Sequence, residues 1–130
     1  MTLLVDNDIV GQALLIRADL AKDGWLDLVE VQFLTLREAG IPDGSRDREI
    51  WRFAQRREML LLTANRNAED EDSLEVTMRQ ESTAESLPVV TISGKDRVAE
   101  TEYRRRCATR LIEIIVDVDQ CRGTRRLFIP

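Results

Sequence analysis

Hydrophobic and polar positions follow two different periods along this chain, and each change of period marks an element. Short apolar runs rich in branched residues have the pattern of β-strands, and the stretches between them repeat apolar residues every three or four positions, as helices do. This pattern predicts strands at residues 2–6, 28–36, 58–65, 89–93 and 125–130, and helices at 9–24, 46–57, 73–81 and about 98–119.

The regular alternation of strands and helices predicts an α/β fold. We expect a three-layer α/β/α sandwich with a central, mostly parallel sheet of about five strands. The glycine- and proline-containing stretch 37–45 is predicted to be a loop whose Ser45 caps the next helix, and Asp72 with Glu75 has the spacing of a capping box. With 130 residues, no repeat and no low-complexity linker, residues 1–130 are expected to form a single domain.

Composition narrows the chemistry that such a domain can perform. The chain has no histidine, which removes serine and cysteine triads and histidine-based nucleases, so acid–base or metal chemistry must come from carboxylates. Cys107 and Cys121 are too far apart for a C-x-x-C pair, and no histidine completes a zinc site. Because the apolar runs are short, we expect neither a membrane span nor a signal peptide, and a cytoplasmic location.

The charge pattern limits the choice of partners. A net charge of −5 argues against nonspecific coating of nucleic acid, because phosphate neutralisation needs an excess of Lys and Arg. Of the 19 basic residues, 17 are Arg. This bias suits phosphate recognition, although biased codon usage explains it equally well. The P-loop and the glycine motif of dinucleotide-binding proteins are both absent.

Polar residues stand where two of the predicted strands end. Asp6 follows the first strand, and the strand at 58–65 leads into the sequence "TANRN". In an α/β sheet, ligands bind outside the carboxyl ends of the strands, so these groups would converge if the two strands are neighbours. Carboxylate and amide oxygens suit Mg²⁺ or Mn²⁺. The candidate metal ligands are Asp6, Asp8, Asp47, Asn65, Asn67 and Asp72.

Simpler structural explanations exist for several of these residues. Asp6 suits a cap of the first helix, Asp47 favours the positive end of its own helix dipole, and Asp72 suits a helix cap. The acids at 69–71 suit a solvated loop. Trp51 is expected in the core or at an interface.

The order of these motifs resembles that of small PIN-like proteins, which are grouped with toxin–antitoxin nucleases. Members of that family carry an acid after the first strand, a Ser-Asp-x-x-Ile/Leu helix start and a strand that ends in Thr-Asn-Asp-x-Asp. The resemblance spans about residues 3–93. The matching positions are Asp6 in "LLVDND", Asp47 in "SRDREI", and Thr63, Asn65 and Asn67 in "TANRN".

The resemblance implies a Mg²⁺- or Mn²⁺-dependent ribonuclease, in which carboxylates hold the ion and the ion activates water for the hydrolysis of RNA. It also implies an antitoxin-like protein partner and a homodimer, for which the helix around Trp51 offers apolar surface. Asn65 and Asn67 replace two acids of the family pattern, so we expect weaker metal binding and weakened catalysis. The catalytic residues would be Asp6, Asp47, Asn65, Arg66 and Asn67, with Arg66 facing the scissile phosphate.

Two other functions remain open. The polar cluster at the strand ends could be a hydrogen-bonded structural element of a non-catalytic α/β module that works by binding a partner. A phospho-acceptor receiver domain is less favoured, because neither an acid pair nor a suitably placed lysine accompanies the strand-end aspartate.

Overall fold

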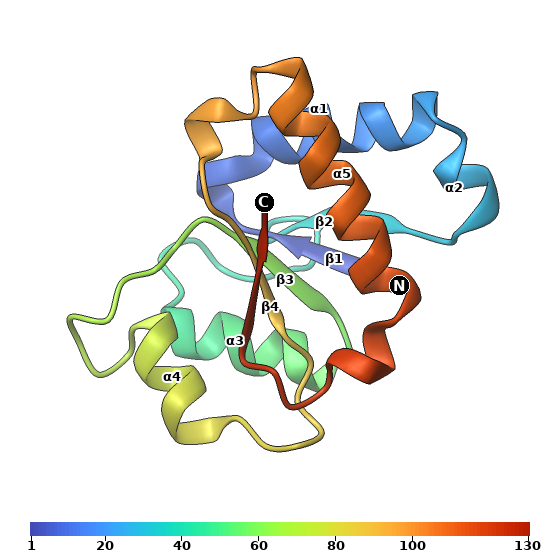
Figure 1. Cartoon of the computed structure of the whole chain (residues 1–130). Coiled ribbons are helices and arrows are strands. Elements are labelled where there is room, and N and C mark those ends of the chain that lie inside the picture. The colour runs from blue at the N-terminus through green and yellow to red at the C-terminus, as the bar shows by residue number, and fades with distance from the viewer.

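The five strands of the central sheet are all parallel and lie in the order β2-β1-β3-β4-β5 (Figure 1). The computed structural model describes residues 1–130. The strands are β1 (Thr2–Val5), β2 (Gln32–Thr35), β3 (Leu60–Thr63), β4 (Val89–Ile92) and β5 (Arg126–Ile129). The helices are α1 (Val10–Lys22), α2 (Trp25–Leu28), α3 (Asp47–Arg56), α4 (Leu74–Glu81) and α5 (Thr101–Val116), with 3-10 turns η1 (Asn7–Ile9), η2 (Lys95–Arg97) and η3 (Val118–Cys121).

Helices cover both faces of this sheet, so the predicted three-layer sandwich is confirmed. In Figure 1, α1 and α5 lie on one face, and α3 and α4 lie on the other. Alternate residues of each strand serve the two faces: Leu62 belongs to a core of 20 buried residues under α1 and α5, and Leu61 belongs to one of 10 under α3 and α4. None of the helices has the length and hydropathy that a membrane span needs.

The strand order places β1 directly beside β3, as the convergence of the two strand ends requires. Leu3, Leu4 and Val5 pair in parallel with residues 60–62, and the backbone N–H of Asp6 extends the pairing by donating to Leu62 O at 3.0 Å. From this pair the strand order runs in opposite directions: β2 lies beside β1, and β4 and then β5 follow beside β3. Such a reversal is where open α/β sheets form ligand crevices.

The predicted helix caps at α3 and α4 are both wrong. Ser45 Oγ donates to Pro42 O at 2.7 Å and does not cap α3, whose N-cap residue is Arg46. Ser73, rather than Asp72, is the N-cap of α4, and its Oγ accepts a hydrogen bond from Val76 N at 3.4 Å. Capping-box spacing alone could not separate the two neighbours, because both side chains are good caps.

Two further differences concern α2 and α3. The helical turn α2 was not predicted; it follows the left-handed Gly24 and delays the next strand to Gln32. Trp51 and Ile50 of α3 are buried in the smaller core. The apolar surface that was expected on α3 for dimer formation is therefore not available there.

Candidate functional site

Asp6 leaves β1 at its carboxyl end and is held by two hydrogen bonds. Thr63 Oγ1 donates to Asp6 Oδ2 at 2.7 Å, and Asn7 N donates to Asp6 Oδ1 at 2.8 Å. Burial raises the pKa of Asp6, because the charged form is poorly solvated there; the bonds from Thr63 and Asn7 counteract this, and nearby Asp8 and Asp47 add to it. The expectation that Asp6 caps the first helical turn is confirmed, since it is the N-cap of η1.

Asp47 connects three elements through a single oxygen. Asn65 Nδ2 donates to Asp47 Oδ2 at 2.9 Å, and the same oxygen accepts the backbone N–H of Leu74 at 3.2 Å. The carboxylate thereby joins the start of α3 to the end of β3 and to the first residue of α4. Asp6, Asp47 and Asn65 line one small cavity of about 10 Å³, which is at the lower limit for a single water molecule.

The turn that follows β3 satisfies its asparagines with its own backbone. Asn65 Oδ1 accepts the N–H of Asn67 at 2.8 Å, and Asn67 Oδ1 accepts the N–H of Glu69 at 2.9 Å. Such bonds from a side chain to the backbone two residues on stabilise tight turns. Both amide oxygens that were predicted to be metal ligands are therefore engaged within the turn.

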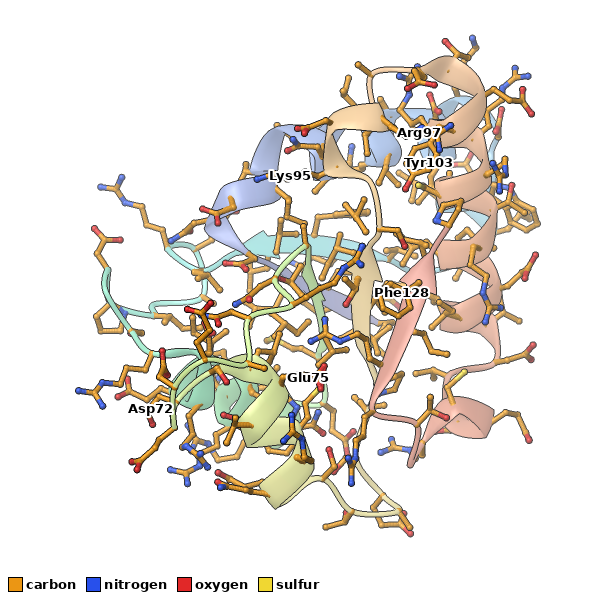
Figure 2. The ribbon with its side chains drawn as sticks, turned by 60° about the vertical axis from the view of Figure 1, so that its left-hand side comes forward. Asp72, Glu75, Lys95, Arg97, Tyr103 and Phe128 are labelled. Atoms are coloured by element: carbon orange, nitrogen blue, oxygen red, sulfur yellow. The ribbon has the colours of Figure 1, made fainter.

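Asp72 lies beside the teal helix α3 in Figure 2. It forms ion pairs with Arg46 and Arg48 of the α3 region. The hydrogen bond from Arg46 is the main reason why the pKa of Asp72 is lowered. Asp72 shares an open hollow with Asp47, but the structure does not bring it to the cavity that Asp6 lines.

A second hollow, of about 420 Å³, lies next to the acids at the carboxyl ends of β3 and β4. Asp8, Arg66 and Lys95 are among its lining residues. Arg66 Nη2 donates to Ser93 O at 2.8 Å, and its guanidinium lies 5.1 Å from the ring centre of Phe128 on β5. Neither Arg66 nor Lys95 takes part in an ion pair.

Arg126, the first residue of β5, bonds to the turn that follows β3. The sequence did not identify it as part of the site. Its side chain is only 8% exposed. Nη1 donates to the backbone oxygen of Asn65 at 2.9 Å and to Thr91 Oγ1 at 2.6 Å, and Nε donates to Glu75 Oε1 at 3.0 Å. Nη2 lies 3.0 Å from the same Glu75 oxygen without forming a hydrogen bond. The missed signal was the two-residue period of β5, which places Arg126 on the face that α4 covers.

The residues in this arrangement do not form a ready site for Mg²⁺ or Mn²⁺. No group of three or more acidic or cysteine side chains is placed to hold a metal ion. Both oxygens of Asp6 accept hydrogen bonds, and the amide nitrogen of Asn65, rather than its oxygen, faces Asp47. A hard cation needs oxygen lone pairs directed at it, and here N–H and O–H donors already occupy part of the lone pairs of Asp6 and Asp47.

Comparison with protein families, with curated proteins and with solved structures found no match for this chain. The PIN-like resemblance therefore depends on the order and spacing of its short motifs.

Proposed function

We propose that the protein is a PIN-like domain that binds RNA at the carboxyl edge of its sheet and, in this hydrogen-bonded arrangement, does not hydrolyse it. The observation that carries the second part is the bond from Asn65 Nδ2 to Asp47 Oδ2. An acid at position 65 would direct a second carboxylate at Asp47, and two such charges repel each other unless a cation or a shared proton lies between them. The amide supplies an N–H instead, so the pair is satisfied without a metal.

The RNA-binding part is supported by the hollow beside the acids. Arg66 and Lys95 border this hollow together with Asp8 and Asp96, and neither base forms an ion pair; Phe128 is 43% exposed next to Arg66. Basic side chains that track phosphates, together with an exposed ring for a base, are the elements of single-strand recognition. Because the whole chain carries a net charge of −5, the phosphate contacts are confined to this edge and few in number.

The test is the fluorescence anisotropy of a labelled single-stranded oligoribonucleotide. We expect weak binding whose logarithm falls with the logarithm of salt concentration with a slope of about −1.4, the value for two phosphate contacts. Arg66→Gln and Lys95→Gln should each weaken binding. The matched control is Arg125→Gln. Arg125 is an exposed arginine directly before β5, and so it lies at the amino ends of the strands rather than at their carboxyl ends. Equal effects of the Arg66 and Arg125 variants, or no binding at about 100 μM protein, would contradict the proposal.

A metal-dependent ribonuclease with weakened catalysis is the second candidate. It is favoured by Asp6, whose half-buried carboxyl lies near Asp8 and Asp47 and has no cationic partner in the chain. Calorimetric titration with Mn²⁺, and cleavage of the same oligonucleotide with Mn²⁺ or with EDTA, separate the candidates. Heat of Mn²⁺ binding together with Mn²⁺-dependent cleavage that Asp6→Asn abolishes would favour the nuclease. An antitoxin-like partner stays a prediction on either view.

A further inference from the structure

Two hollows of the surface meet at the turn η2. The first, of about 420 Å³, is the one that Arg66 borders at the ends of β3 and β4. The second, of about 390 Å³, lies against the start of α1, and its lining includes Gly11 and Leu15. Lys95 and Asp96 line both hollows, and Lys95 lies close to the first turns of α1 in Figure 2. The two hollows are therefore neighbours, and these two residues form their shared rim.

Helix α5 holds the backbone of the shared rim in place. The N–H of Gly94 donates to Tyr103 Oη at 2.7 Å. A Cβ atom at position 94 would lie 3.1 Å from the same oxygen, which is closer than an ordinary contact. Arg97 lies over the Tyr103 ring, with its guanidinium 4.4 Å from the ring centre, and forms an ion pair with Glu100. Of the two basic residues in η2, only Lys95 is without an ion pair.

The second hollow offers a contact for each part of a nucleotide. Leu15 is 44% exposed and Ala99 is exposed beside it in the lining, which gives the hollow an apolar wall. Gln12 supplies an amide, which can both donate and accept hydrogen bonds. At Gly11, nothing lies within 4 Å of the place where a Cβ atom would stand. The wall, the amide and the ammonium group of Lys95 complement the face of a base, its edge and a phosphate.

We propose that a single strand of RNA bound beside Arg66 continues across the shared rim into the second hollow at α1. This path rests on the proposed RNA binding and extends it. Lys95 contacts the phosphate at the crossing, and the nucleotides on the two sides of that phosphate lie in the two hollows. Asp96 repels phosphate, but its carboxylate accepts hydrogen bonds, and the 2′-hydroxyl next to the phosphate is a donor that DNA lacks. The rim thereby distinguishes RNA from DNA.

The first test is the affinity of uridine monophosphate and of uridine oligoribonucleotides up to about eight nucleotides long, measured at low salt by competition with a labelled oligonucleotide. We expect a gain of about tenfold once the strand is long enough to fill both hollows. Gly11→Gln places a side chain in the second hollow and should remove this gain. The fold tolerates the change, because the space is open and glutamine favours a helix more than glycine does.

The matched control is Ala18→Gln. Ala18 is exposed about two turns further along α1 and lines neither hollow, so this variant should keep the gain with length. Equal effects of the two variants would overturn the path, and so would a Gly11→Gln protein that binds the longest oligonucleotide as the wild type does while Arg66→Gln weakens it. No binding at any length, or binding that Arg66→Gln does not weaken, would instead contradict the proposed function, and the path with it. Circular dichroism checks that each variant is folded.

The second test compares uridine oligoribonucleotides with deoxyuridine oligonucleotides of the same length. The wild type should prefer RNA about tenfold, the effect of one hydrogen bond to a charged group, and Asp96→Ala should lower this preference to about twofold. The control is Asp43→Ala, which removes an exposed acid that lines neither hollow and should leave the preference unchanged. Because loss of an acid strengthens the binding of both nucleic acids, the ratio of the two affinities is the quantity to compare. Equal affinities of the wild type for RNA and DNA, or a preference that survives Asp96→Ala, would overturn the placement of the ribose on the rim.

Discussion

The two faces of the sheet are held by different interactions. Beneath α1 and α5 lies a core of 20 buried residues, and one ion pair, between Arg104 and Asp19 at 3.0 Å, joins the two helices. Beneath α3 and α4 the core has only 10 buried residues. There Arg48 of α3 forms ion pairs with Asp72, just before α4, and with Glu81 of α4. Charged and hydrogen-bonded contacts therefore connect α3 and α4, which share little buried apolar surface.

This difference explains why the polar residues that looked like metal ligands are so fully engaged. Asp47, Asn65 and Asp72 all belong to the α3–α4 side, and each bonds to a residue of a different element. Their hydrogen bonds and ion pairs take the place of the larger core on the opposite face. Exposed apolar side chains lie instead on the opposite side of the sheet, on the outer surface of α1 and α2.

The largest effect that would test this comparison comes from truncating one buried leucine in each core, at neighbouring positions of β3. Leu62→Ala in the larger core should lower the free energy of unfolding by about 4 kcal/mol, and Leu61→Ala in the smaller core by about 3 kcal/mol. Both side chains are buried, so the difference reports how closely each side is packed. Urea unfolding measures both values. An equal or larger loss for Leu61→Ala would contradict the comparison.

The next largest effect concerns the contact between Asn65 and Asp47. Without a divalent cation, Asn65→Asp should lower the free energy of unfolding by about 2 kcal/mol, because it places like charges together in a partly buried site. The control is Asn67→Asp, which keeps the oxygen that accepts the N–H of Glu69 and should change stability by less than about 0.5 kcal/mol.

Repeating these unfolding curves with millimolar Mn²⁺ separates the two candidate functions. Recovery of the stability of Asn65→Asp would show that an acid at this position recreates a cation site. If Asn65→Asp were neutral with and without Mn²⁺, the side chain would be solvated, and the bond to Asp47 would not carry the argument for a closed site.

The sequence was sufficient for the fold because strand and helix periods are local properties that burial on a parallel sheet enforces. It also predicted that the "TANRN" turn converges with Asp6 if the two strands are neighbours, and the structure supplies that adjacency of β1 and β3. The bonding partners could not be predicted. Arg126 reaches the carbonyl of Asn65 from 61 residues away, and the Asn65 amide donates to Asp47, which lies 18 residues away in the sequence. Cys107 is buried on α5, and burial raises the pKa of its thiol to about 11.

A smaller effect distinguishes the observed cap of α4 from the one that the sequence suggested at α3. Ser73→Ala should lower the free energy of unfolding by about 1 kcal/mol, because the N–H of Val76 loses its acceptor at a helix end on the polar face. Ser45→Ala should have almost no effect, since Ser45 caps no helix. Thermal unfolding of the two variants compares them directly, and equal losses would count against the assigned caps.

The smallest effects concern how two carboxyl groups, those of Asp6 and Asp72, change the stability of the fold with pH. Their pKa values are shifted in opposite directions. Burial raises the pKa of Asp6 above its ordinary value of 3.8, so the folded protein holds this proton more tightly than the unfolded chain does. Stability from Asp6 is fully present below pH 3.8 and is lost as the pH rises through the folded pKa. Arg46 lowers the pKa of Asp72, so its contribution is present above pH 3.8 and is lost as the pH falls through the folded pKa.

Urea midpoints measured from pH 3 to pH 7 for the wild type and two variants would reveal these opposite signs. As the pH rises from 3, Asp6→Asn should gain stability relative to the wild type, because its side chain no longer has to ionise in a partly buried site. Asp72→Asn should lose relative stability over the same interval, because the charge that pairs with Arg46 is missing. A hydrogen bond lost through either substitution shifts the midpoints equally at every pH, so only the slopes carry the test. If the urea midpoints of the two variants changed with pH in parallel, the two carboxyl groups would not have oppositely shifted pKa values. The raised pKa of Asp6, which marks it as the best candidate for binding a cation, would then be wrong.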